Sequence, residues 1–255
     1  MTDYTVGVLE DAIKILNTLR DHNTGLTLSE ITDTSGFVKN KVFRLLYTLE
    51  KNQMVDRDSN GLYHMGIQMI TYAQTVEHKN WLMVASHEVM DWLVDVTGET
   101  IFLGIVSGNE ALCIATREST QSIRLYAEVG RRAPLHSGGV PKALLANLPD
   151  TVRTEKLEAM RNNEDAPDMS QLADELYEIQ QQGFVVVVDE LDVGAHSVAA
   201  PIFNHNGHVV AALSIAGPSV RFTSDKIEEY RGLVLSATRQ ISQKLGHRAQ
   251  EKVPS

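Results

Sequence analysis

The sequence predicts a two-domain α+β protein, with a small helical domain ending in a β-hairpin and a larger domain built on an antiparallel sheet flanked by helices. The chain has 255 residues, enough for two modest domains. Apolar residues recur at helical spacing up to about residue 51, and short strand-like stretches separated by turn residues dominate from about residue 101. We therefore expect a compact domain over 1–65, a linker helix over 66–79, a larger domain over 80–248 and a flexible tail over 249–255.

The composition is that of a folded intracellular protein. A single cysteine, Cys113, allows no intramolecular disulfide, so we expect the reducing cytoplasm. Met1 to Leu9 lacks the features of a secretory signal, and the apolar stretches Phe184–Val188 and Val209–Ile215 are too short to span a membrane. The net charge of −10 lies mostly beyond residue 65, which leaves the first domain close to neutral and compatible with nucleic acid.

Two short helices are predicted at the start of the chain. The first is indicated by apolar residues at helical spacing and ends near Asn23–Gly25; these residues are Leu9, Ala12, Ile13, Leu16 and Leu19. Thr27 and Glu30 have the spacing of a capping box, so a second helix should follow and run to about Asp33. The turn after it ends in Gly36, which can adopt positive φ.

The third helix, predicted from Phe37 to about Lys51, carries the functional argument. Its core face is predicted to hold Val38, Val42, Leu45, Leu46 and Leu49. Candidate DNA contacts, with basic groups for phosphates and an amide for base edges, are Lys39, Asn40, Lys41, Arg44 and Tyr47, of which Lys41 lies at the edge of the core arc. An ordinary solvated helix would look similar in isolation. Helix, glycine turn and helix in this order favour a DNA-binding helix-turn-helix.

A β-hairpin after this helix predicts the wing of a winged helix-turn-helix. Val55–Arg57 and Leu62–His64 flank a turn containing Asn60-Gly61, a pair typical of type I′ hairpin turns. Arg57 is placed to reach the minor groove or a phosphate, and is equally well explained as a solvated hairpin charge.

The rest of the chain is predicted as one sheet-containing domain. The linker helix, Gly66 to about Glu77, is apolar enough to suggest burial against a second subunit. Further helices are predicted over 81–96, 141–147, 170–182 and 224–245, with Ser170 as a cap and Gly183 as a stop. Strands are predicted over 101–106, 111–115, 122–127, 184–188, 195–203 and 208–216, and 161–167 is expected to be a polar loop.

Several motifs in this domain resemble the IclR family of transcription regulators. They are PLHSGGVPKALLA at 134–146, Gly183–Phe184, Asp189–Glu190, GAHSVAAP at 194–201 and AALSIAGP at 211–218. Together with the helix-turn-helix and the wing, they cover nearly the whole chain in order. The resemblance implies a GAF-like or profilin-like effector domain, a dimer or tetramer, and an effector such as an organic or aromatic acid. A dimer is expected to bind a pseudo-palindromic operator in double-stranded DNA.

By position, the resemblance places the effector pocket between a glycine loop and the sheet. The residues carried over are Gly138, Gly139, Val140, Ala195, Ser197 and Ser214. Three departures from the family pattern disfavour the pocket of its keto-acid sensors and favour a less polar or aromatic ligand. Pro141 removes a backbone donor, Ser197 stands where cysteine is common, and Val185–Val188 lacks an acidic residue.

Other classes of function have weaker support. His136 and His196 are candidate effector contacts, although strand alternation should prevent His196 and Ser197 from facing the same side. No cysteine–histidine spacing matches a zinc site, so neither a metal nor a cofactor is expected. Arg124, Arg131 and Arg132 are expected mainly in surface ion pairs, with an anionic ligand as the alternative partner.

An enzyme is not expected, because no nucleophile elbow, phosphate loop or dinucleotide motif is present. A ligand-free DNA-binding scaffold is the remaining alternative.

Overall fold

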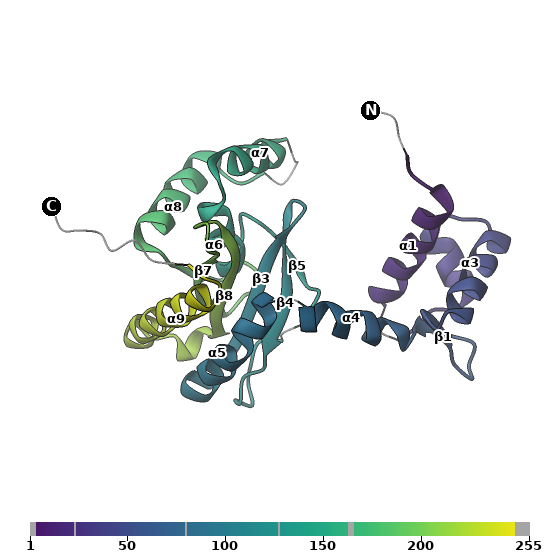
Figure 1. Ribbon diagram of the computed structural model, residues 1–255, viewed down its shortest axis with the longest axis horizontal. Coiled ribbons are helices and arrows are strands. Elements are labelled where there is room, and N and C mark those ends of the chain that lie inside the picture. Colours follow the sequence, from purple (N-terminus) through teal and green to yellow (C-terminus); the bar gives the residue numbers. More distant parts are fainter. Residues whose placement is uncertain (1–3, 23, 80, 127, 163–165, 248–255) are drawn as a thin grey trace. The chain divides into compact units, whose positions relative to one another are not determined.

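Figure 1 shows the computed structural model, which describes residues 4–22, 24–79, 81–126, 128–162 and 166–247. The chain divides into two compact units, Met1–Asn80 and Trp81–Ser255. Asn23 and the tail predicted over 249–255 lie outside the described residues. Within the described part of the chain, no helix is both long and apolar enough to cross a membrane.

The first unit is a three-helix domain with a hairpin, as predicted. Its helices are α1 (Gly7–Arg20), α2 (Leu28–Ser35) and α3 (Lys39–Lys51), and its strands are β1 (Val55–Arg57) and β2 (Tyr63–Met65). Their side chains bury one core, which includes Ile15, Ile31, Leu46, Val55 and Tyr63. Helix α4 (Gln68–Lys79) follows the hairpin along the chain. Ile70 and Tyr72 on α4 are exposed.

The turn between α2 and α3 is set by local sequence. The capping box is confirmed: the Glu30 carboxylate accepts from the Thr27 backbone N–H at 2.7 Å, and Thr27 Oγ1 accepts from the Glu30 N–H at 3.3 Å. Gly36 closes α2 with φ of +72°, a conformation that disfavours side chains with a Cβ. Helix α3 starts two residues later than predicted, so Val38 is its N-cap residue and 72% exposed rather than part of the core.

The hairpin turn differs from the predicted type I′ turn. A type I′ turn needs positive φ at both central residues, but Asn60 has negative φ and only Gly61 of the pair is positive, at +82°. The Gly61 N–H donates to the Asp58 carbonyl at 3.1 Å. One Asp58 carboxylate oxygen accepts from the N–H groups of Asn60 and Leu62, at 2.9 and 2.8 Å. The aspartate side chain therefore organises the turn and makes a second left-handed residue unnecessary.

The second unit is built on a six-stranded antiparallel sheet with the strand order β5-β4-β3-β8-β7-β6. The strands are β3 (Thr100–Ser107), β4 (Glu110–Arg117), β5 (Arg132–Pro134), β6 (Val185–Val188), β7 (Ala195–Phe203) and β8 (Val209–Pro218). The central strands are long and apolar because helices cover both faces of the sheet.

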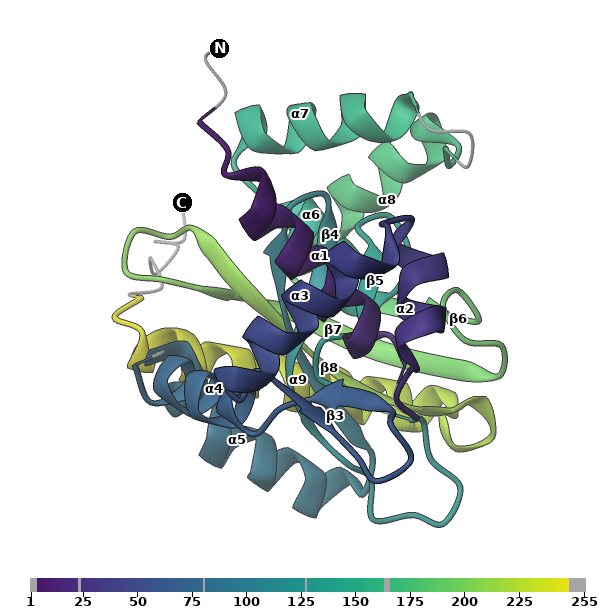
Figure 2. The same ribbon diagram turned by 90° about the vertical axis from the view of Figure 1, so that its right-hand side faces the viewer.

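Each face of the sheet has its own hydrophobic core. Helices α5 (Trp81–Thr97) and α9 (Ser224–Lys244) cover one face, and α6 (Gly139–Asn147), α7 (Asp150–Arg161) and α8 (Met169–Gln182) lie on the other (Figure 2). Strand β7 shows how alternation divides the side chains. Val198 and Ala200 pack toward α5 and α9, whereas Ala199 packs toward α6 and α8.

Three local predictions for this unit were wrong. Residues 122–126 form no strand, Ala127 lies outside the described residues, and the strand that pairs with β4 is β5 at 132–134. Helix α7 occupies a segment for which no helix was predicted. The cap of α8 is Asp168, whose carboxylate accepts from the backbone N–H groups of Ser170 and Gln171. The predicted stop is confirmed, since Gly183 ends α8 with φ of +78°.

Candidate functional site

The outward face of α3 presents polar and aromatic side chains to solvent. Lys39, Asn40, Arg44 and Tyr47 are all exposed, as the helical period predicted. Within the described residues, the side chains of Lys39, Asn40 and Arg44 form no ion pair or hydrogen bond with the rest of the chain. Tyr47 is 63% exposed. These side chains are therefore free to contact a partner without breaking an internal interaction.

Lys41 differs from its neighbours on α3. Its ammonium nitrogen lies 2.6 Å from the Asp11 carboxylate on α1 and 4.3 Å from the centre of the Phe37 ring. The positive charge of Lys41 is thus already paired within the unit. Its contacts place it between α1 and the start of α3, and its side chain is 40% exposed.

Arg57 lies across the hairpin. Its guanidinium carbon is 5.3 Å from the centre of the Tyr63 ring on the neighbouring strand. A Cβ added at Gly61 would lie 3.3 Å from one guanidinium nitrogen, so the glycine leaves room for this side chain. The hairpin therefore presents a cation beside its turn.

A cavity of about 110 Å³ lies between the start of α6 and the sheet of the second unit. Its walls are mostly apolar. The structure brings to this cavity all seven predicted effector residues, the six carried over from the family resemblance and His196: Gly138, Gly139, Val140, Ala195, His196, Ser197 and Ser214. A Cβ added at Gly139 would come within 2.7 Å of the Ser197 hydroxyl oxygen, so the absence of a side chain there allows the helix to approach β7.

Strand alternation separates His196 from Ser197, as the sequence predicted. The pairing of β7 with β6 and β8 is regular at these two residues. The His196 ring makes an edge-to-face contact with Phe222, 5.9 Å between ring centres, on the face covered by α5 and α9. Ser197 points toward α6 and the cavity. His196 therefore borders the cavity, but its ring packs on the opposite face of the sheet.

A β-bulge places Cys113 in the cavity wall. Between β3 and β4 the register shifts, so that Leu103 pairs with Ala115 and Gly104 pairs with Cys113. Ala115 then packs toward α5 and α9, and Cys113 lines the cavity. Burial raises the pKa of the Cys113 thiol to about 11. The thiol is therefore protonated at neutral pH.

The first backbone donor of the glycine loop is occupied by a side chain of the protein itself. The Gly138 N–H donates to one carboxylate oxygen of Glu190 at 2.8 Å, and the Lys142 ammonium lies 2.6 Å from the other. Lys142 also donates to Glu175 at 2.7 Å, and its side chain is only 8% exposed. Burial lowers the pKa of Lys142, but the hydrogen bonds with Glu175 and Glu190 outweigh this effect and raise it. Glu190 belongs to a motif of the family resemblance, yet no spacing in the sequence indicates this pairing.

His136 lies beside this cluster and away from the first cavity. It lines a second, more polar cavity of about 290 Å³ with Lys142 and Glu175. Its Nδ1 atom is buried and has no hydrogen-bond partner among the described residues. Burial, together with the charge of Lys142, lowers the pKa of His136. The structure thus separates His136 from His196, with which it was grouped as a candidate effector contact.

Two loops meet at the cavity through an ion pair. Arg131, just before β5, donates two hydrogen bonds to the Asp192 carboxylate, at 3.0 and 2.9 Å, and both residues line the cavity. Asp192 lies in the connection between β6 and β7. The expected surface ion pairs of Arg124 and Arg132 are present, with Glu118 and Glu110. Arg131 differs from them because it borders the cavity.

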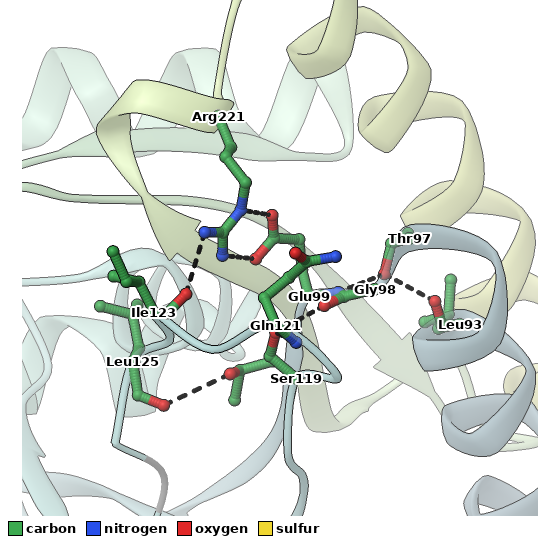
Figure 3. Close-up of polar contacts among 10 residues, drawn as sticks. Leu93, Thr97, Gly98, Glu99, Ser119, Gln121, Ile123, Leu125 and Arg221 are labelled. Atoms are coloured by element: carbon green, nitrogen blue, oxygen red, sulfur yellow. Dashed lines mark hydrogen bonds and ion pairs between the residues drawn. The ribbon is translucent and has the colours of Figure 1, made fainter.

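The loop that ends at Arg131 is anchored at its other end by a buried ion pair (Figure 3). Glu99 is 2% exposed and receives two hydrogen bonds from Arg221, at 2.5 and 2.6 Å. Arg221 also donates to the Ile123 carbonyl at 2.9 Å, and Ser119 donates to the Gly98 carbonyl. These bonds fix residues 119–123 to the start of β3. Leu125, which comes after them, lines the cavity.

Comparisons with known proteins match both units. The family profile described as "IclR helix-turn-helix domain" matches residues 8–59, and "Bacterial transcriptional regulator IclR C-terminal" matches residues 74–243. The HTH-type transcriptional regulator KipR of Bacillus subtilis (strain 168) is 33% identical over 234 residues, which cover 89% of this chain and 92% of KipR.

Solved structures agree over nearly the same length. The crystal structure of Thermotoga maritima IclR shares 28% identity with a TM-score of 0.76, covering 94% of this chain and 99% of that one. An IclR homolog from Microbacterium hydrocarbonoxydans, crystallised with 4-hydroxybenzoate, shares 21% identity with a TM-score of 0.80, covering 93% of this chain and 98% of that one. At this identity the second likeness shows the fold alone.

Proposed function

The chain belongs to the IclR family of DNA-binding transcription regulators, and we propose that a small organic acid in the cavity of its second unit controls its affinity for an operator. It is a regulator and not an enzyme, like the relatives that it matches. The observation that carries the proposal is the cavity itself, since the predicted pocket residues from α6, β7 and β8 gather around one apolar space.

The proposed DNA contacts are the exposed side chains of α3 and the hairpin. Lys39, Asn40 and Arg44 are exposed and carry the cations and the amide that phosphates and base edges require. Tyr47 is proposed to contact the sugar-phosphate backbone, and Arg57 a phosphate or the minor groove. Lys41 is proposed to hold α3 in place through Asp11 instead.

Two copies of the chain are proposed to share the operator. A single α3 reads only a few base pairs, so a dimer that places two such helices one helical turn apart explains how enough contacts are made. This arrangement also suits a chain with a net charge of −10, because the operator then meets two small basic faces rather than one.

The proposed ligand is a small acid with an apolar or aromatic body. Phe102, Leu125 and Val187 supply apolar wall, and Ser197 and Ser214 supply hydroxyl groups. The 4-hydroxybenzoate bound by the Microbacterium hydrocarbonoxydans homolog is a ligand of this chemistry. Val187 supports the same class, because an acidic side chain facing the cavity from β6 would repel an anion.

A thermal-shift screen followed by DNA binding tests the proposal. The purified protein is screened against small aliphatic and aromatic acids, with 4-hydroxybenzoate included, and a true ligand raises the melting temperature saturably. The hit is then added to the protein bound to an operator selected from random duplexes, and fluorescence anisotropy should show a change in operator affinity.

The variant Ser214→Leu fills the cavity and should remove both effects while leaving ligand-free operator binding intact. Ser224→Leu, at the exposed start of α9, is the matched control and should behave like the wild type. Operator binding that no acid changes, in a folded protein, would instead favour a ligand-free DNA-binding scaffold.

A further inference from the structure

Arg131 and Asp192 join two loops from opposite parts of the sheet. Arg131 ends the connection between β4 and β5, and Asp192 lies in the connection between β6 and β7, whereas β5 and β6 are the two edge strands. The two hydrogen bonds between the side chains, at 3.0 and 2.9 Å, therefore link loops that the sheet itself keeps apart. Both side chains border the cavity.

Among the charged side chains around the cavity, one is a cation that could bind an anion. Among the described residues that line the cavity, Arg131, Glu190 and Asp192 are charged. Glu190 already holds the Gly138 N–H and the Lys142 ammonium, and Pro141 has no N–H to offer. The Glu190 carboxylate at the Gly138 N–H therefore repels a second anion at the start of α6. Arg131 is the cation that borders the cavity, and only Asp192 competes for its two donors.

The opening of their ion pair has different consequences for Arg131 and Asp192. The Arg131 carbonyl accepts from the Cys113 N–H at 2.9 Å, which holds the arginine beside β4 and the cavity wall. Asp192 is the more exposed partner, 45% against 37%, and its loop is bounded by two residues with positive φ, Asp189 and Gly194. Because both side chains are partly exposed, Asp192 can turn into water at little cost, whereas the backbone bond to Cys113 keeps Arg131 at the cavity. The exchange therefore favours an incoming anion.

We propose that Arg131 is the specificity-determining anion receptor of this cavity, and that Asp192 is an internal carboxylate that the ligand replaces. This inference rests on the proposed function and names the side chain that binds the anionic group of the ligand. It assigns to the cavity a ligand with one anionic group on a small apolar body. Ligand binding then also releases the β6–β7 loop from the β4–β5 loop.

Cys113 offers a test that needs neither the natural ligand nor DNA. It is the only cysteine of the chain and lines the same cavity. Methanethiosulfonate reagents of similar size but opposite charge, sulfonatoethyl and trimethylammonioethyl, both react with its thiolate to form a mixed disulfide and release methanesulfinate. The measurement is the ratio of the two labelling rates, which cancels changes in the reactivity of the thiol itself.

The proposal predicts that the anion-to-cation ratio of labelling rates is higher in the folded wild type than in the urea-unfolded chain, which gives the intrinsic preference of the thiolate. Arg131→Met should lower the anion-to-cation ratio by about tenfold, and Arg131→Lys should restore most of it. Asp192→Asn should raise the ratio severalfold, because it removes the internal competitor. The matched control is Arg132→Met, which removes the same charge from a residue paired with Glu110 and should leave the ratio nearly unchanged.

Three results would overturn the proposal. A ratio lower in the folded wild type than in the urea-unfolded chain would assign the cavity to cations, with Asp192 as their receptor. A ratio that falls equally in Arg131→Met and Arg132→Met would show only the general field of the protein. No reaction with the small neutral reagent methyl methanethiosulfonate would show that the cavity does not admit ligands beside Arg131. A regulator whose operator affinity responds to no acid contradicts the proposed function instead, whatever the labelling ratio.

Discussion

The two units differ in whether the cations of their candidate sites are paired within the protein. On the outer face of α3, Lys39 and Arg44 are exposed and form no ion pair within the described residues. Around the cavity of the second unit, Arg131 and Lys142 are each bonded to carboxylates of the chain itself. On the proposed function, DNA binds without breaking internal contacts, whereas an anionic ligand replaces the Asp192 carboxylate at Arg131. Exposed, unpaired cations suit a long-range attraction to DNA, which salt weakens by screening. Internally paired cations suit selectivity among small molecules, because a ligand must compete with the internal carboxylate.

The sharpest test of the internally paired unit is Lys142→Met. The substitution leaves Glu190 and Glu175 without their shared cation in a place where Lys142 is only 8% exposed. The two carboxylates left behind are about one third exposed, so the substitution should lower the free energy of unfolding by about 2–3 kcal/mol. Urea denaturation measures the loss. The control is Lys226→Met, which breaks an exposed pair with Glu229 and should cost less than about 1 kcal/mol. Equal losses would contradict the contrast between buried and exposed pairs.

Cys113 tests how well water is excluded from the cavity wall. Because burial raises its thiol pKa to about 11, little thiolate is present at pH 8. Alkylation by iodoacetamide at pH 8 should be roughly 100-fold slower than in the urea-unfolded chain, and should rise steeply toward pH 11. Mass spectrometry of the labelled protein gives the rates. A native rate equal to the unfolded rate would mean that the cavity wall is open to solvent.

Among the exposed, unpaired cations of α3, Arg44 provides the test. Arg44→Ala should weaken operator binding by about 1–3 kcal/mol, and should reduce the slope of log affinity against log salt concentration by about one. Anisotropy titrations at several salt concentrations measure both quantities. Lys51→Ala removes the same charge from the last turn of α3 and should have a smaller effect. If the two variants weaken binding equally, the contact face of α3 is assigned incorrectly.

The smallest predicted effect concerns pH. Burial and the charge of Lys142 lower the pKa of His136 below that of the unfolded chain, so the folded state binds fewer protons as the pH falls through that range. Stability from this residue is full above the ordinary histidine pKa and is lost toward pH 5. Urea midpoints at pH 7 and pH 5 should differ less in His136→Gln than in the wild type. An unchanged difference would place the pH dependence elsewhere.

The first unit could be predicted from sequence because its signals are local. Thr27 and Glu30 lie three residues apart, and Gly36 closes the same helix, so the capping box and the left-handed turn could be read directly. The prediction of a type I′ turn was wrong because the Asp58 side chain provides hydrogen bonds that the Asn-Gly pair alone does not reveal.

The second unit was predicted only where its motifs are local. The glycine loop and the strand motifs were enough to bring Gly138, Ser197 and Ser214 together. The ion pairs that shape the cavity join residues far apart in sequence, 61 positions for Arg131 and Asp192 and 52 for Gly138 and Glu190, and no spacing rule predicts such pairs. The alternation around Ile123 was misleading, because this residue is 74% exposed and no strand pairs with it.

Reciprocal linkage between the cavity and the helix-turn-helix domain is the most direct test of ligand control, because ligand and operator must then influence each other by one common factor. The measurement is a calorimetric titration of the ligand identified by the screen into the free protein and into the protein saturated with operator. We predict that the operator changes ligand affinity by the same factor, about 5–150-fold, by which the ligand changes operator affinity. Equal ligand affinity with and without operator would show that the cavity and the helix-turn-helix domain act independently, and would contradict ligand control of DNA binding.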